Sequence, residues 1–81
     1  MNISIINGTF EPKDALDILS QFISVKIKFH EQKIHRSLNE EDIKMREKRI
    51  IELQDSLFQI RKLIQNDMQP VSLQCNLEIL K

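Results

Sequence analysis

The stretch Ser-Leu-Asn-Glu-Glu-Asp, residues 37–42, lies between two long helical patterns and decides the fold. Asn39 has the side chain of a helix N-cap, and Leu38 and Ile43 occupy the two positions of a hydrophobic staple around it. Asn39 then has Asp42 at position N3. Ser37 with Glu40 also satisfies the spacing of a capping box, which leaves the start of the second helix open by about two residues. Either boundary predicts a tight turn at residues 37–39 and an antiparallel helical hairpin.

The first helix of this hairpin is predicted over residues 12–37. Pro12 suits the first helical position, where no N–H is needed, and Asp14 places negative charge near the helix N-terminus. At 100° per residue the apolar side chains form two rows that together span roughly 200°. One row is Ala15, Ile18, Phe22, Val25 and Phe29, and the other is Leu16, Leu19, Ile23, Ile27 and Ile34. One neighbouring helix cannot cover so wide an arc, so we expect a second surface to pack on the first half of this helix.

The second helix, predicted over residues 40–66, carries the heptad repeat of a coiled coil. Its a and d positions are Ile43, Arg46, Ile50, Leu53, Leu57, Ile60 and Ile64. A further apolar row, Ile51 and Phe58, lies to one side. Folding the chain at the turn pairs positions whose numbers sum to about 77, so that the apolar rows meet. His30 then falls level with Arg46 and Glu47, and we expect these three residues to form a polar layer between the helices.

A short strand is predicted at each end of the chain. Residues 2–6 are rich in isoleucine, with Ile3 and Ile5 on one face, and the Asn7-Gly8 pair that follows is a turn signal. The last strand is predicted over residues 71–80, because residues 71–79 alternate strictly between apolar and polar. Because the hairpin returns the chain to its starting end, the two strands can pair antiparallel. The sequence therefore predicts one α+β domain over residues 1–81, mainly α, in the order β-α-α-β.

Two properties of this arrangement predict that two chains associate. A chain of 81 residues has a core that supplies only about 3–5 kcal/mol. A two-stranded sheet is marginal alone, and the longer C-terminal strand would leave its outer edge unpaired. We therefore expect a homodimer with a helical bundle and a shared sheet. The candidate interface residues are Phe22, Phe29, Ile51, Phe58, Leu73 and Leu77.

Composition narrows the environment of the protein. Twelve basic residues balance 12 acidic ones, so no net field attracts the chain to nucleic acid or to an anionic membrane. Cys75 is the single cysteine, which excludes an internal disulfide, and its place on the apolar face of the last strand predicts a small buried side chain. No apolar run is long enough for a signal peptide or a membrane span. We expect a cytoplasmic protein without membrane contact.

Motifs for catalysis or metal binding are missing from the sequence. His30 and His35 are five residues apart, which places the two rings about 140° apart on a helix, whereas the His-Glu-x-x-His zinc motif requires a spacing of four. Gly8 is the single glycine, so there is no glycine-rich phosphate loop and no nucleophile elbow. We expect no enzymatic activity, no cofactor and no metal site.

Two functional hypotheses follow. The leading one is a non-enzymatic homodimeric interaction or assembly module, and since helical hairpins occur in many unrelated proteins, the shape identifies no pathway. The alternative is a nucleic-acid-associated accessory protein that would contact phosphates through Lys33, Lys44 and Lys48. The acidic turn, the zero net charge and the lack of Trp and Tyr for base stacking make nucleic acid the less favoured partner.

Overall fold

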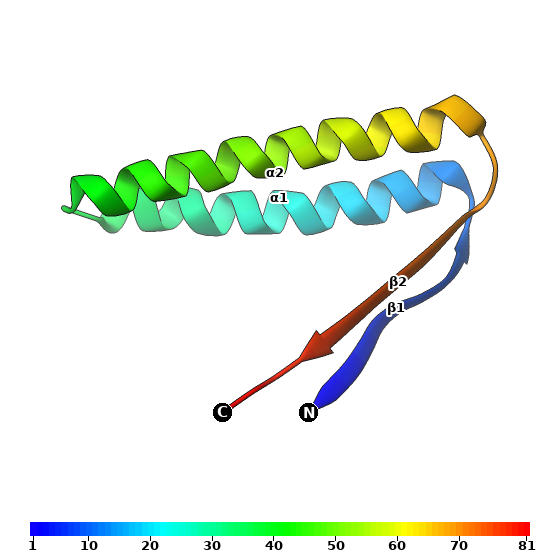
Figure 1. Cartoon of the computed structure of the whole chain (residues 1–81), viewed down its shortest axis with the longest axis horizontal. Coiled ribbons are helices and arrows are strands. Elements are labelled where there is room, and N and C mark those ends of the chain that lie inside the picture. Colours follow the sequence, from blue (N-terminus) through cyan, green and yellow to red (C-terminus); the bar gives the residue numbers. More distant parts are fainter.

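The computed structural model describes residues 1–81 apart from the side chain of Asp67, and its elements follow the order β1-α1-α2-β2 (Figure 1). Strand β1 spans Asn2–Phe10, helix α1 spans Pro12–Arg36, helix α2 spans Glu40–Asp67 and strand β2 spans Val71–Glu78. The predicted β-α-α-β order with mainly helical content is confirmed. The two helices form the predicted antiparallel hairpin, and the two strands form one antiparallel sheet.

The turn between the helices is capped as predicted. The side-chain oxygen of Asn39 accepts hydrogen bonds from the backbone N–H groups of Glu41 and Asp42, at 2.9 and 3.3 Å. Helix α1 ends at Arg36, one residue before the predicted end, and the N–H of Ser37 donates to the carbonyl of Ile34 at 3.2 Å. Asn39 is therefore the N-cap of α2, and the alternative cap at Ser37 is excluded.

Replacing Asn39 with alanine is expected to lower the free energy of unfolding by about 1 kcal/mol, because two N–H groups of α2 lose their acceptor. The measurement is urea denaturation followed by circular dichroism at one fixed protein concentration. Asn39→Asp is the control, since aspartate keeps the accepting oxygen and should retain most of the stability. Equal losses in both variants would contradict a capping role.

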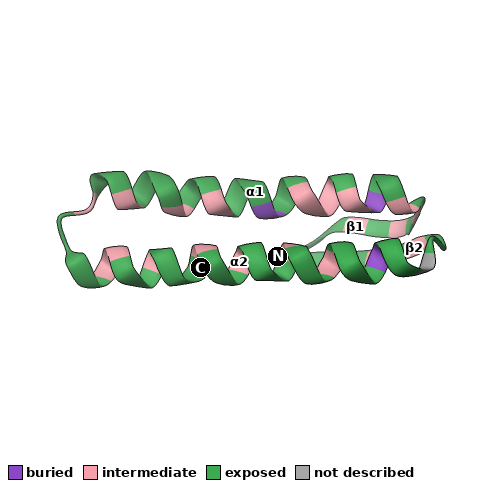
Figure 2. Ribbon diagram, turned by 90° about the horizontal axis from the view of Figure 1, so that it is seen from above, coloured by how far each residue is buried: buried purple, intermediate pink, exposed green. Residues whose placement is uncertain are grey.

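The heptad residues of α2 form the contact between the helices. All seven a and d residues are buried or half-buried, with Ile64 only 5% exposed, and Ile23 on α1 is 9% exposed. Figure 2 shows that the less exposed positions of the two helices lie mainly on the sides that face each other. The predicted packing of the heptad row of α2 against the first helix is confirmed.

The first strand differs from its prediction. Strand β1 continues to Phe10 instead of ending at residue 6, and Asn7 and Gly8 pair with Gln74 and Leu73 of β2 rather than forming a turn. Gly8 does not adopt a positive φ, so its conformational freedom is not used. Pairing with β2 holds this segment extended, because the backbone groups of Gly8 face β2, and this pairing overrides the local turn signal.

The strand lengths also correct the expectation of an overhanging C-terminal strand. Strand β2 ends at Glu78 rather than residue 80, so β2 has eight residues and β1 has nine. The unpaired edge of β2 therefore does not come from excess length. It comes from the fact that a two-stranded sheet leaves one edge of each strand without a neighbour.

A β-bulge in β1 gives the sheet one fully apolar face. The register shifts between Ser4 and Ile6, so Ile3 pairs with Leu77 while Ile6 pairs with Cys75. Residues directly opposite each other have their side chains on the same face of the sheet. Because the bulge adds one residue to β1, the side chain of Ile3 shares a face with Ile6, and not with Ile5 as predicted. One face carries Ile3, Ile6, Phe10, Val71, Leu73, Cys75 and Leu77, and the other carries Asn2, Ser4, Asn7, Thr9, Ser72, Gln74, Asn76 and Glu78.

The hairpin and the sheet form a flat, open V. In Figure 1 the sheet lies on the α1 side of the hairpin, meets it at the N-terminal end of α1 and then diverges from it. The molecule measures 46 × 33 × 13 Å and has a radius of gyration of 15.3 Å. A compact chain of this length would have a radius of gyration of about 12 Å. Much of each apolar surface therefore stays outside the core.

Candidate interaction surfaces

The apolar row on α1 that includes Phe22 and Phe29 faces away from α2. The residues of α1 that pack against α2 can be numbered as the a and d positions of a heptad, and the residues of this row then occupy c and f positions. These positions lie on the opposite side of α1 from α2, which is the side where the sheet lies in Figure 1. Ala15, next to the vertex of the V, is fully buried and Ile18 is half-buried. Phe22, Val25 and Phe29 are 42%, 67% and 51% exposed. The predicted second surface on α1 is thus the sheet, but the sheet covers only the first turns of the helix.

A shallow hollow marks the part of α1 where this cover ends. It has a volume of about 290 Å³ and is lined by Ile18, Gln21, Phe22 and Val25. Only one of these four side chains is polar. The hollow is therefore suited to an apolar side chain of a neighbouring molecule rather than to a charged ligand.

The apolar face of the sheet shows the same gradient. Near the vertex, Phe10, Val71 and Leu73 are half-buried, whereas Ile3 and Leu77 at the far end are exposed. Cys75 is also exposed, so the prediction of a buried cysteine is wrong. The alternation along β2 identified the face of Cys75 correctly, but the sheet has already diverged from α1 at this residue.

These two surfaces are called the inner faces: Phe22, Val25 and Phe29 on α1, and Ile3, Cys75 and Leu77 on the sheet. Their exposure is reflected in the total accessible surface of 6803 Å². A compact monomer of 9.6 kDa exposes about 5100 Å². Each chain therefore exposes about 1700 Å² more than a compact fold of its size.

A polar cluster interrupts the helix contact near the turn. The guanidinium of Arg46 donates to Nδ1 of His30 at 3.1 Å and to Oδ2 of Asp42 at 3.2 Å. The ring of Phe29 lies edge-on to His30, with 5.5 Å between centroids, and 5.8 Å from the Arg46 guanidinium. Of the predicted polar layer the structure brings His30 and Arg46 together. Glu47 is exposed and forms no hydrogen bond or ion pair with the side chains that the structure describes.

Asp42 is the member of this cluster that sequence reasoning missed. The sequence places Asp42 in the helix cap and in the acidic turn, but an aspartate four residues before an arginine is also a recognisable helix pair. The Asp42 and Arg46 side chains are 31% and 21% exposed, so the cluster lies at the border of the helix contact. It holds Arg46 in place through one partner on each helix.

The other predicted interface residues lie on a separate surface. Ile51 and Phe58 are 64% and 60% exposed and occupy b positions of α2, on the outer side of the hairpin. The ammonium group of Lys62 lies 5.5 Å from the centroid of the Phe58 ring. The structure therefore divides the six candidates: Phe22, Phe29, Leu73 and Leu77 belong to the V, and Ile51 and Phe58 do not.

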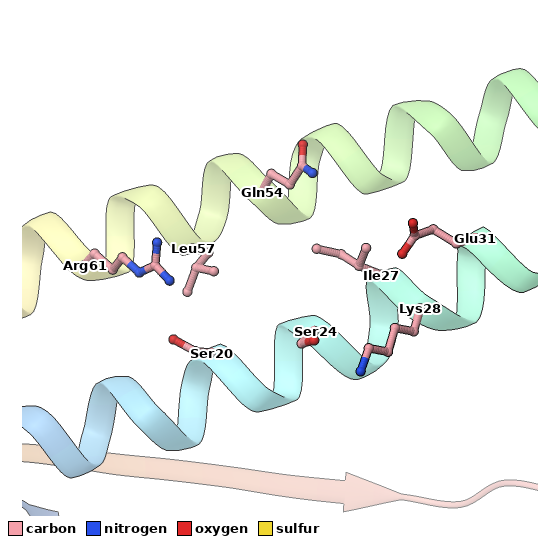
Figure 3. Close-up of a pocket in the computed structure, with 8 residues that line it drawn as sticks. All are labelled: Ser20, Ser24, Ile27, Lys28, Glu31, Gln54, Leu57 and Arg61. Carbon is pink, nitrogen blue, oxygen red and sulfur yellow. The ribbon is translucent and has the colours of Figure 1, made fainter.

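An open groove along the two helices was not anticipated from the sequence. Figure 3 shows Lys28 and Glu31 on α1 and Gln54 and Arg61 on α2 along this groove, which has a volume of about 430 Å³. The remaining lining residues are Ser20, Ser24, Ile27 and Leu57. Its charged residues are two basic ones, Lys28 and Arg61, and the acidic Glu31, so the groove has no strong preference for an anion or a cation.

The residues proposed to contact phosphates are all at the surface. Lys33, Lys44 and Lys48 are exposed, and the ammonium group of Lys33 lies 5.6 Å from the centroid of the Phe29 ring. Apart from Asp67, no three His, Cys, Asp or Glu side chains are placed so that they could hold a metal ion. Within the described residues, neither helix is both long and apolar enough to cross a membrane. Nucleic-acid binding stays a prediction of the sequence.

Comparison with protein-family models, with characterised proteins and with solved structures finds no significant match for this chain. Function is therefore inferred from the surfaces of the molecule itself.

Proposed function

We propose that this protein is a non-enzymatic interaction module that works as a homodimer, in which a second copy covers the inner faces of the V. The observation that carries the proposal is the exposure of apolar side chains on both arms of the V, with Phe22, Val25 and Phe29 on α1 and Ile3 and Leu77 on the sheet. Three apolar residues, Ala15, Ile23 and Ile64, are buried among the side chains that the structure describes. So small a core gives a single chain little stability, and large exposed apolar patches are typical of interfaces.

The exposed area has the size that an obligate dimer needs. The excess of about 1700 Å² per chain corresponds to about 3400 Å² if two chains cover each other. Obligate homodimers bury roughly 2000–5000 Å² in total, whereas weak encounters bury less than about 1200 Å². An excess surface of this size supports a permanent interface rather than a transient one.

Closure of the V within one chain would be the competing way to cover these faces. Only Glu11 separates β1 from α1, and its carbonyl accepts the N–H of Ala15 at 2.9 Å. At the other connection Met68 adopts a left-handed conformation and donates its N–H to the carbonyl of Ile64. Two short connections, both hydrogen-bonded to the helix ends, restrict the angle between sheet and hairpin. These restraints favour a second chain as the cover.

Light scattering coupled to size-exclusion chromatography tests the proposal. We expect a mass of twice the 9.6 kDa of one chain from high to low micromolar concentration. A compact monomer of 9.6 kDa throughout this range would overturn the proposal.

A further inference from the structure

The two outer edges of the sheet are not equivalent. Natural proteins protect an exposed edge from pairing with another strand by a bulge, by proline or by charged side chains, lysine above all. Strand β1 contains the bulge between Ser4 and Ile6, which breaks its regular spacing. Strand β2 is regular over Val71–Glu78 and contains no proline, no basic residue and a single charge, at its last position. The edge of β2 is therefore the one able to accept a further strand.

The hydrogen bonds of the sheet identify the backbone groups on this edge. The N–H of Ile79 donates to the carbonyl of Met1 at 2.8 Å. Backbone groups alternate in direction along an antiparallel strand, so the odd-numbered residues of β2 face β1. The N–H and C=O groups of Ser72, Gln74, Asn76 and Glu78 consequently point to the outer edge. Their side chains all lie on the polar face, and all four residues are exposed.

We propose that two copies of the chain join through β2 into one antiparallel four-stranded sheet, in the order β1-β2-β2-β1. The inference rests on the proposed homodimer and names the edge through which it forms. Antiparallel pairing of identical strands puts the two-fold axis perpendicular to the sheet, so both apolar faces point to the same side. The axis then lies midway between the two β2 strands, at the point where one residue faces the same residue of the other copy. The longest overlap places that residue at Gln74 or Cys75.

This pairing matches the gradient of burial along the sheet. In antiparallel β2 strands, Val71 of one chain lies beside Leu77 or Ile79 of the other. The vertex end of each V, where Phe10 and Val71 are half-buried, is thereby placed next to the exposed end of the other sheet. The helical hairpin of the second copy begins at that position and lies on the apolar side of the common sheet. Each chain thus supplies cover where the other chain lacks it.

A pair of proline variants tests the edge directly. Asn7 and Gln74 are directly opposite each other in the sheet. The N–H of Gln74 points to the outer edge of β2, and the N–H of Asn7 points to the outer edge of β1. Proline at either position leaves the β1-β2 hydrogen bonds in place but removes an N–H from one outer edge. We expect Gln74→Pro to weaken the dimer about a hundredfold and Asn7→Pro to leave it unchanged, measured by analytical ultracentrifugation.

The comparison separates this inference from the proposed function. A dimer that survives Gln74→Pro, or that both proline variants weaken equally, would overturn pairing through β2 and leave the homodimer standing. A wild-type monomer would overturn both. Circular dichroism of each variant establishes that the helices are retained.

Amide hydrogen exchange of the unmodified protein gives a second test that requires no variant. Pairing through β2 protects the amides of Ser72, Gln74 and Asn76 as well as those of Leu73 and Cys75, which face β1. Fast exchange at the three even-numbered residues, with slow exchange at Leu73 and Cys75, would show a free edge and contradict the inference. Protection in both sets at concentrations where the protein is dimeric would support it.

Discussion

Replacing Phe22 with aspartate is expected to separate the proposed homodimer into monomers at micromolar concentration. Phe22 is 42% exposed in the single chain, belongs to the inner face of α1 and lines the shallow hollow on that helix. In the proposed homodimer a second copy covers this side chain, so a carboxylate at the position would lose its hydration without gaining a partner. Burial of an unpaired charge together with the loss of apolar contact costs on the order of 4 kcal/mol, about a thousandfold in the dissociation constant. Sedimentation equilibrium measures this constant directly.

Phe58→Asp is the matched control for this variant. Phe58 is also an exposed phenylalanine on a helix, at 60%, but it lies on the outer side of α2. We expect the Phe58→Asp protein to remain dimeric. If Phe58→Asp separates the chains and Phe22→Asp does not, the interface is the outer side of α2 and the assignment of the inner faces is wrong.

Replacing Ile64 with alanine is expected to reduce the free energy of unfolding by about 3 kcal/mol. Ile64 is 5% exposed, close to the vertex where the second connection leaves the helix, and the structure describes few other buried side chains. A domain of this size has a total stability of only several kcal/mol, so the variant should be partly unfolded at room temperature. Urea denaturation at a fixed protein concentration measures the change.

The neighbouring residue provides the control. Leu63 is 75% exposed and also loses a branched side chain on substitution by alanine. Because it contributes little buried surface, Leu63→Ala should change the free energy of unfolding by no more than about 0.5 kcal/mol. Similar losses at Leu63 and Ile64 would mean that the Leu63 side chain is covered in the folded protein, which its exposure in the single chain does not indicate.

The helical hairpin could be predicted because its signals are local and agree with one another. Asn39 stands at a cap, and the heptad row of α2 runs from Ile43 to Ile64 without a break in spacing. Each of these signals depends on residues within four positions of one another in the sequence. The position of His30 opposite Arg46 could be predicted from the turn alone, because a tight turn determines which residues face each other across the hairpin.

The sheet was less predictable because its register depends on residues that are far apart in sequence. The Asn7-Gly8 signal is local, but pairing with Gln74 and Leu73 determines the conformation of these residues. The bulge that aligns Ile3 with Ile6 has no signature in β1 by itself; it becomes evident only against the strict alternation of β2. The exposure of Cys75 depends on the angle between sheet and hairpin, which no sequence pattern encodes.

The pairing of Phe10 with Val71 determines the order in which the molecule can fold. These residues are separated by about 60 positions, so joining them directly in an unfolded chain carries a large entropy cost of loop closure. The helical hairpin contains short-range contacts and can form early. Once α1 and α2 are paired, the ends of the chain are already neighbours, and the strands can join from Phe10 and Val71 outward. We therefore expect the sheet to form after the hairpin and to be the first part to open on unfolding.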